Sequence, residues 1–352
     1  MISKIFYLLF ILLIIFRVAS VSYDYPEGKI IRLSGRVLTD PIVYDTARYI
    51  KVKGLTAYID LFPEVSYGDR VILEGEVEGD RLRKAKVVEL RQGGGLYDTR
   101  EKIVSLFRKA FPEPHASLVG GIVLGSKTGM PEDFWESLKA SGTAHVVVAS
   151  GMNVTFVASF LVNSLVHFIK RQKAIIVALL GAWVYVLLSG FDAPLVRAAI
   201  MGSIAFGAQG MGRVNIALRA LIFSAGLMLV LKPEWVYDLG FILSFFATLS
   251  LVLFETRISG LLERFPFLFK KDLATTLAAQ IGVSPILLLA FGGFNIFSPF
   301  INALILWTVP PIMIIGAAAA ITGLVIPQLG QAILYLAYPF TYWYIKIVEL
   351  FS

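Results

Sequence analysis

Residues 145–168, HVVVASGMNVTFVASFLVNSLVHF, decide the fold class of this chain. These 24 positions contain no Lys, Arg, Asp or Glu, and about 20 apolar residues suffice for a helix to cross a bilayer. The same character recurs down to the C-terminus. Including this one, we count eight apolar segments, at about 145–168, 174–190, 194–211, 214–231, 236–254, 273–291, 298–324 and 330–350. The sequence therefore predicts a polytopic α-helical membrane protein.

The distribution of charge divides the chain in two. Residues 1–142 carry 20 Lys or Arg and 18 Asp or Glu, whereas residues 143–352 carry only 12 and 7. The first part can fold in water, and the second suits a bilayer. The chain has no cysteine, which excludes disulfides and thiolate chemistry. Its three histidines are too scattered for a His-rich metal site, and we predict no metal and no cofactor.

Short alternating segments follow an apolar start. Residues 5–16 are continuously apolar, and we expect residues 1–22 to form an uncleaved anchor with its N-terminus inside. Residues 28–91 then alternate between apolar and polar side chains in five stretches separated by Gly and Asp. This pattern predicts a small β-barrel domain over residues 23–95, with the OB-fold as the natural five-stranded candidate.

Aromatic and basic residues recur on two of these predicted strands. Barrels of this kind bind single-stranded nucleic acid by stacking bases on aromatic rings and contacting phosphates with basic residues. The candidates here are Tyr49, Lys51, Lys53 and Tyr58. A strand face that is merely solvated is the alternative interpretation.

Residues 96–142 connect the two parts. Apolar residues at helical spacing predict a helix over residues 97–111, lying in the membrane interface or packed on the barrel. Pro112 and Pro114 end this helix, and residues 116–125 are apolar but too short to span.

Basic residues in the loops predict the orientation. They gather after the first, third and fifth segments of residues 143–352, whereas the alternate loops hold only Lys232. Cytoplasmic loops carry the excess of Lys and Arg, so the barrel lies outside the cytoplasmic membrane. The expected N-terminal anchor places it on the same side.

Polar residues inside the apolar segments are the candidates for a pathway, since they are costly there. Most fall in the outer half of the predicted membrane domain, where Asp238 could neutralise Arg197. The first segment is unusual, because Ser150 and Gly151 interrupt it near the middle. His145 lies on one predicted polar stripe with Ser159, Asn163 and His167, but Ser150 and Asn153 leave that stripe unless the helix breaks. We predict the path residues to be His145, Ser150, Gly151, Asn153, Arg197, Asp238, Gln280 and Asn302.

Several of these residues stand in ordered motifs. FWESLKASGTAHVVVASGMN at residues 134–153 holds His145, Ser150 and Gly151. Further along come PLVRAAIM at 194–201, the 233–248 stretch with DLGF and LSF, and finally Gln280, Pro285, Phe291-Gly292, Asn302 and Pro310. Together these motifs resemble the ComEC competence family over about 200 residues. Asn153 stands where many members have His.

The resemblance implies a membrane channel that imports single-stranded DNA during natural transformation, without being an enzyme. It further implies an N-terminal OB-like region, a cytoplasmic helicase-like ATPase and a DNA receptor on the outer face. Many members continue into a metallo-β-lactamase-like domain, but its His-x-His-x-Asp-His cluster is not found in these 352 residues. A separate nuclease and a homo-oligomer are left open. A competence-type membrane domain of about eight helices is expected over residues 143–352.

Two other functional classes compete with this interpretation. A secondary transporter of a small solute or lipid would also be a bundle of apolar helices, and the Pro310-Pro311 pair must kink or split the segment at 298–324, as transporter helices often are. An intramembrane serine hydrolase could use Ser150 with His145 or His167. On a continuous helix, however, His145 and Ser150 lie about 140° apart around the axis, which argues against direct contact.

Overall fold

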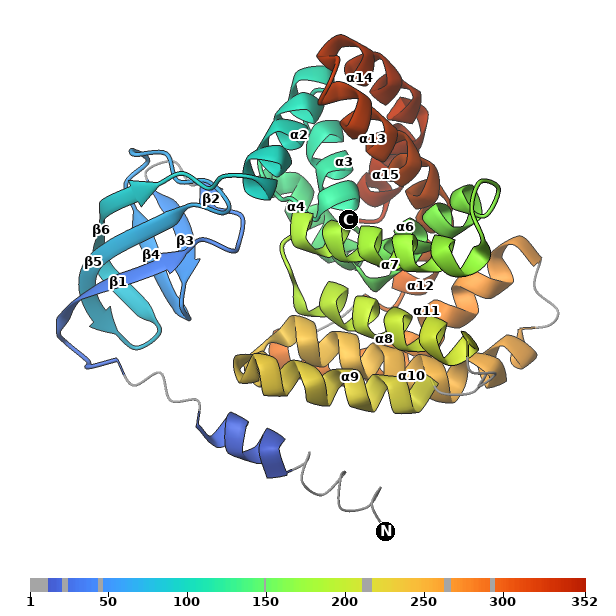
Figure 1. Cartoon of the computed structure of the whole chain (residues 1–352), viewed down its shortest axis with the longest axis horizontal. Coiled ribbons are helices and arrows are strands. Elements are labelled where there is room, and N and C mark those ends of the chain that lie inside the picture. The colour runs from blue at the N-terminus through green and yellow to red at the C-terminus, as the bar shows by residue number, and fades with distance from the viewer. Residues whose placement is uncertain are drawn as a thin grey trace.

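The structure is a computed structural model with a small β domain followed by a larger helical part (Figure 1). It describes residues 12–20, 25–43, 47–148, 150–210, 217–262, 267–291 and 295–352, without the side chains of 43, 207–210, 267–272 and 291. Residues 12–19 are helical, and Arg17 Nε donates a hydrogen bond to Val230 O at 3.0 Å. The rest of the predicted anchor, residues 1–11, 21 and 22, lies outside the described residues.

The β domain is one twisted sheet with the strand order β1-β5-β6-β4-β3-β2 among the described residues. The β4–β6 pair is parallel, and the other pairs are antiparallel. Strands β3 and β4 form a tight hairpin because Lys53 and Gly54 adopt positive φ angles, 47° and 87°. The strands are β1 (Ile30–Arg36), β2 (Ile42–Val43), β3 (Arg48–Val52), β4 (Leu55–Ile59), β5 (Arg70–Glu78) and β6 (Arg81–Arg91).

The five predicted strands are confirmed, but the predicted barrel does not close. A sixth strand, the two-residue β2, extends one edge beyond β3. Strands β1 and β3 share no ladder pairing in the described residues, although a Cβ on Gly35 of β1 would overlap the Val52 side chain of β3. The sheet therefore curls until these strands touch, around a core of alternating inward residues such as Val37, Ile50 and Leu73.

The helical part begins directly after the glycine-rich link at 93–95. Its first elements are α2 (Leu96–Ala110), α3 (His115–Leu124), α4 (Glu132–Ala140), α5 (Ala144–Val147), α6 (Gly151–Leu165), α7 (Arg171–Leu188), α8 (Ala193–Gly210) and α9 (Ala217–Leu231). They are followed by the 3₁₀ turn η1 (Pro233–Tyr237), α10 (Leu239–Leu261), α11 (Phe267–Phe291), α12 (Ser298–Ile305), η2 (Leu306–Thr308), α13 (Val309–Gly323), α14 (Pro327–Leu334), η3 (Tyr335–Ala337) and α15 (Tyr338–Leu350).

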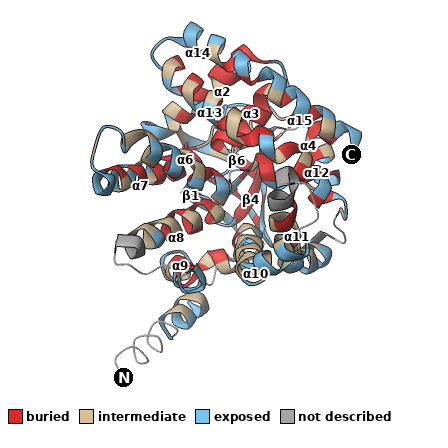
Figure 2. Cartoon of the chain, turned by 90° about the vertical axis from the view of Figure 1, so that its right-hand side faces the viewer, coloured by how far each residue is buried: buried red, intermediate tan, exposed pale blue. Residues whose placement is uncertain are grey.

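Four helical stretches in the described residues are long and apolar enough to cross a membrane. They are Arg171–Leu188, Leu239–Leu261, Leu273–Ala290 and Ser298–Gly323. Four apolar helices are shorter, namely His115–Leu124, Gly151–Leu165, Ala193–Phe206 and Ala217–Leu231. Figure 2 shows α10 and α11 largely exposed or half-buried. Their outer surface is apolar, with Leu253 and Leu289 among its exposed side chains, as contact with lipid requires.

Three of the eight predicted segments are not continuous α-helices. The first breaks between α5 and α6, and α6 ends at Leu165, before His167. The predicted polar stripe from His145 to His167 is therefore interrupted. The last segment divides into α14, η3 and α15, with Pro339 in the first turn of α15. The predicted effect of Pro310-Pro311 is confirmed, because the 3₁₀ turn η2 separates α12 from α13 immediately before them.

Helix α3 forms the centre of the largest apolar core. Residues 116–124 are all buried, and the core continues into α2, α13 and α15 (Figure 2). The predicted helix at 97–111 is confirmed as α2, but its apolar face, including Phe107, packs against α3 and α14 instead of a membrane interface or the barrel. A second core joins α6, α7, α8 and α10.

Candidate functional site

The break between α5 and α6 brings an irregular piece of backbone into the helical part. Ser150 has an extended conformation, with φ −115° and ψ 167°, and stands at the cap position of α6. The first internal bond of α6 runs from Asn153 N to Ser150 O at 3.1 Å. Backbone donors at the start of a helix have no partner within it, so the N–H groups of Gly151 and Met152 are directed out of the helix end.

Asn153 fixes this break to the helix behind it. Its Nδ2 donates to Ile122 O at 2.8 Å, and its Oδ1 accepts from Ser150 Oγ at 3.2 Å. The side chain is fully buried. Ile122 belongs to the last turn of α3, whose carbonyls lack helical partners. Asn153 therefore satisfies a buried carbonyl, a bond that holds α6 against α3.

Arg197 of α8 lies against the start of α6. Only 9% of the residue is exposed. Its Nη1 donates to Ser244 O of α10 at 2.7 Å, while its Nη2 lies 3.3 Å from where a Cβ on Gly151 would stand. One guanidinium thus bridges α8 to α10 and presents its second arm to the N-terminus of α6.

The predicted neutralisation of Arg197 by Asp238 is wrong. Asp238 caps α10, where its Oδ1 accepts from Phe241 N at 2.8 Å. In the described part of the chain, Arg197 forms no ion pair with any carboxylate. The cap satisfies a helix terminus, which leaves Arg197 bonded to a neutral carbonyl.

The remaining predicted path residues gather at the start of α12. His145 Nδ1 lies 3.1 Å from Gly142 O, and Ser298 Oγ donates to the same carbonyl at 3.2 Å. Asn302 is buried, and its Nδ2 donates to Ser298 Oγ at 3.3 Å. Its Oδ1 has no hydrogen-bond partner among the described residues. These contacts join the α4–α5 loop to α12.

Gln280 of α11 reaches the same region by a long contact. Its Nε2 lies 3.5 Å from Asn295 O, and Asn295 Nδ2 donates to Ala140 O at 2.7 Å. The structure therefore divides the predicted path residues into two groups. Ser150, Gly151, Asn153 and Arg197 form one at the helix break, with Asp238 on the same helix as the Ser244 partner of Arg197. The other consists of His145, Gln280 and Asn302.

Three of the four predicted DNA-contacting residues, Tyr49, Lys51 and Tyr58, share one face of the β3–β4 hairpin. Tyr49 and Tyr58 are opposite each other in the register, with ring centroids 5.6 Å apart and edge to face. Lys51 follows Tyr49 at an alternate position, so it lies on the same face of the strand. Lys53 stands in the turn after β3, with φ 47°. Lys51, Lys53 and Tyr58 are exposed. The geometry thus provides an accessible aromatic and basic face.

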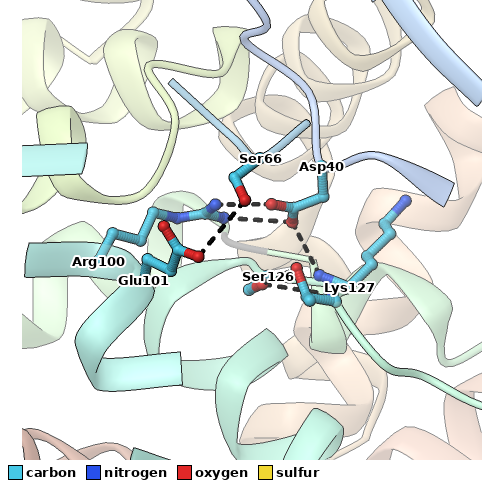
Figure 3. A network of polar contacts seen from close by, with 7 residues as sticks. Asp40, Ser66, Arg100, Glu101, Ser126 and Lys127 are labelled. Carbon is cyan, nitrogen blue, oxygen red and sulfur yellow. Dashed lines mark hydrogen bonds and ion pairs between the residues drawn. The ribbon is translucent and has the colours of Figure 1, made fainter. Parts of the chain in front are cut away.

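A buried junction that the sequence did not predict fixes the β domain to the helices. Asp40, after β1, forms a two-pronged ion pair with Arg100 of α2, with N–O distances of 2.6 and 3.2 Å (Figure 3). Asp40 Oδ2 also accepts from Lys127 N at 2.9 Å. Beside it, Ser66 Oγ donates to Glu101 Oε1 at 3.4 Å. Sixty positions separate Asp40 from Arg100, so no local pattern could have indicated the pair.

Tyr67 extends this junction toward the α7–α8 loop. Arg100 Cζ lies 4.1 Å from the centre of its ring, and Gly190 approaches its hydroxyl so closely that an added Cβ would lie 3.4 Å away. Burial raises the pKa of Tyr67 to about 12. Asp192 follows in the same loop, where desolvation and then the charge of Asp238 raise the pKa of its carboxyl to about 6. The β domain therefore docks where α7 ends and α8 begins.

The alternative of a serine hydrolase lacks its geometry here. Ser150 Oγ donates to Asn153, and His145 interacts with Gly142 O instead. A nucleophilic serine requires a base within hydrogen-bond reach. In the described residues no group of three or more His, Cys, Asp or Glu side chains could hold a metal.

Comparison with known proteins identifies the family. Residues 122–352, well over half of the chain, match the family model described as "Competence protein". The chain belongs to the competence protein family. The family match covers every helix from the end of α3 onward, including the break at Ser150 and Arg197. With the four apolar helices, membership indicates a multi-pass membrane protein.

This chain matches only part of the length of two known relatives. "ComE operon protein 3" of Bacillus subtilis (strain 168) is 28% identical over 207 residues, 58% of this chain and 26% of that protein. An "Uncharacterized protein" of Aquifex aeolicus (strain VF5) is 25% identical over 263 residues, 72% of this chain and 61% of that one. No solved structure matches the competence chain.

Proposed function

We propose that this competence protein conducts single-stranded DNA across the cytoplasmic membrane during DNA uptake. The break between α5 and α6 carries the proposal. Irregular backbone at membrane depth is tolerated only where it is buried in protein or lines a water-filled cavity. Here the break adjoins Arg197 and lies in the part of the chain that matches the competence family.

The β domain would receive the strand before it enters the helices. Its hairpin offers Tyr49 and Tyr58 for base stacking and two lysines for phosphates, a combination that binds single strands without strong sequence preference. The buried Asp40–Arg100 pair fixes this domain to α2, and Tyr67 reaches the loop between α7 and α8.

The direction of transport follows from the loop charges. Lys170 precedes α7, and Arg171 and Lys173 lie in its first turn, at the end of α7 opposite the docked β domain. We infer that this end is cytoplasmic and that the β domain is extracytoplasmic. A strand entering beside the β domain would leave toward a cytoplasmic helicase-like ATPase, with a DNA receptor on the outer face. A homo-oligomer and a separate nuclease are compatible with this arrangement.

The experiment is a planar-bilayer recording of the full chain. A DNA channel should give an ionic conductance that oligothymidylate blocks transiently, with longer blocks at voltages that pull the strand inward. The Gly151→Ala variant narrows the helix break and should shorten or abolish these blocks, because a Cβ there would stand 3.1 Å from Ala198 Cβ. Gly260→Ala is the matched control, since its Cβ would meet nothing within 4 Å.

The rival transporter predicts a different result. A secondary transporter of a small solute or lipid gives saturable flux, and oligothymidylate would not alter it. Absence of strand-dependent block in the bilayer would overturn the channel proposal, and normal DNA uptake in cells lacking the gene would overturn it independently.

A further inference from the structure

We propose that the N-terminus of α6 and the free arm of Arg197 form a binding site for a single phosphodiester anion. The inference rests on the proposed function and deepens it, because it assigns one phosphate contact on the strand's path. Two positively polarised groups from different helices face the same point, and the described residues contribute no negative charge between them.

The first component is the backbone at the start of α6. With 15 residues, this helix is long enough to carry a dipole equivalent to about half a positive charge at its first turn. The N–H groups of Gly151 and Met152 have no bonded acceptor among the described residues. Ser150 Oγ does not cap them, because it donates to Asn153. Free donors at a helix start are suited to phosphate oxygens.

The second component is the guanidinium of Arg197. Only 9% of Arg197 is exposed, and its Nε has no hydrogen-bond partner within the described residues. Nη1 is bound to Ser244 O, and Nη2 points toward Gly151. A buried charge without a counter-charge is strongly destabilising. The positive end of the α6 dipole repels the Arg197 charge and adds to that cost. An anion bound to both groups would lower the electrostatic cost of each.

Glycine at position 151 allows these two components to approach each other closely. A Cβ there would lie 3.1 Å from Ala198 Cβ and 3.3 Å from Arg197 Nη2, which is tighter than ordinary contact. Only hydrogen occupies this point, so Nη2 can lie directly beside the backbone at the start of α6. An anion oxygen bound next to this contact could accept from Nη2 and from a backbone N–H together.

The composition of the site favours a phosphodiester over a more highly charged group. One guanidinium arm and two backbone donors match the two unesterified oxygens and single charge of a phosphodiester. This chemistry is shared by the backbone of a nucleic acid strand and the headgroup of an anionic phospholipid. Because few donors contribute, binding should be weak and reversible, as conduction requires.

The test uses the salt dependence of strand binding. The probe is fluorescent oligothymidylate, titrated against the full chain in phosphatidylcholine nanodiscs at several salt concentrations. For a single strand, each phosphate contact contributes about 0.7 to the slope of log affinity against log salt. We expect Arg197→Gln to reduce that slope by about 0.7, and Arg197→Lys to keep it. A methylphosphonate oligomer, which carries no backbone charge, should bind both variants equally.

Two further variants test the site without removing the Arg197 side chain. Gly151→Ala retains the charge but crowds Nη2 away from the start of α6, so it should reduce the slope as Arg197→Gln does, even if the latter folds poorly. Lys346→Gln on α15, whose charge is already paired with Glu349 at 2.8 Å, is the control and should leave the slope unchanged. If Arg197→Gln and Gly151→Ala instead keep the slope but lose co-purifying phosphatidylglycerol, the site exists and its phosphate comes from lipid.

The site proposal is overturned if neither the slope nor the bound phospholipid changes in Arg197→Gln and Gly151→Ala. That result is distinct from failure of the proposed function. A wild-type chain that shows strand-blocked conductance but a slope independent of Arg197 conducts DNA without this site. A wild-type chain without strand-blocked conductance refutes the channel, whatever the slope.

Discussion

The Arg100 guanidinium encloses the Asp40 carboxylate in a two-pronged ion pair, with both side chains at least 92% buried. Asp40 belongs to the β domain, and Arg100 belongs to the first helix of the helical part. Because Asp40 also accepts from Lys127 N, three separate segments meet at one carboxylate. The orientation of the β domain therefore depends on a buried charge pair.

Removing one partner of this pair should loosen the junction strongly. Arg100→Gln leaves the Asp40 carboxylate buried without its counter-charge, which costs about 3–5 kcal/mol in comparable sites. We expect a large fall in the thermal midpoint and faster proteolytic cleavage at the 93–95 link. Arg32→Gln is the control, because its pair with Glu74 is exposed and such pairs are worth about 1 kcal/mol or less. Equal effects of the two substitutions would contradict the role of Arg100.

The exposed hairpin face should account for much of the strand affinity of the β domain. Tyr58 is 48% exposed and can stack on a base, and an aromatic–base stack is worth about 1–3 kcal/mol. Tyr58→Ala should therefore weaken oligothymidylate binding by about 5- to 150-fold, measured by fluorescence anisotropy on the full chain. Phe62→Ala removes a ring that is 83% exposed after β4. If it weakens binding as much as Tyr58→Ala does, the hairpin face is not the binding face.

Local sequence patterns predicted the individual elements well. Alternation identified the strands, and the Pro310-Pro311 pair indicated the split that η2 produces. Ser150-Gly151 indicated a helix break, because these residues favour irregular backbone over a continuous apolar helix. The division of the last segment was not predicted, although Pro339 lies in the first turn of α15.

Tertiary partners could not be predicted in the same way. Asp238 was expected to pair with Arg197 because their charges are opposite and their predicted depths agree. In the structure Asp238 instead caps α10 by accepting from Phe241 N, while Arg197 donates to Ser244 O. Likewise, the curl of the sheet leaves β1 and β3 in contact but unpaired. These outcomes depend on which of several available partners the packed chain brings nearest.

Asp192 should make stability depend on pH in a window set by its carboxyl. Its pKa is raised from 3.8 to about 6, so the folded chain binds this proton more tightly than the unfolded chain does. The tighter proton binding of Asp192 in the folded chain therefore stabilises the folded state fully below about pH 4. This stabilisation is lost as the pH rises through about 6. Asp192→Asn is neutral throughout, so it should be more stable than the wild type at pH 7.5.

The measurement is the thermal midpoint of both chains in detergent between pH 4 and 7.5. The advantage of Asp192→Asn should shrink as the pH falls and vanish near pH 4. Asp133→Asn, at an exposed position on α4, serves as the control for removing one carboxylate charge. An advantage of the same size at both ends of the range would show that Asp192 does not titrate as proposed.

Asn153 should be required for folding of the helix break. Asn153→Ala leaves Ile122 O buried without its donor, which costs about 1–3 kcal/mol. Ser150→Ala removes only a 3.2 Å bond to the Asn153 side chain, for which about 0.5–1.5 kcal/mol is expected. The thermal midpoint in detergent should therefore fall more for Asn153→Ala than for Ser150→Ala.

The same comparison separates a structural role of Asn153 from a direct role in transport. If Asn153 acts only by holding α6 to α3, DNA uptake per folded molecule should remain near normal in the surviving Asn153→Ala protein. Asn153→Gln keeps the amide but lengthens the side chain in a fully buried position, so overpacking should destabilise it as well. Uptake per folded molecule that falls at least tenfold in Asn153→Ala, with an unchanged thermal midpoint, would instead assign Asn153 to the path of the strand.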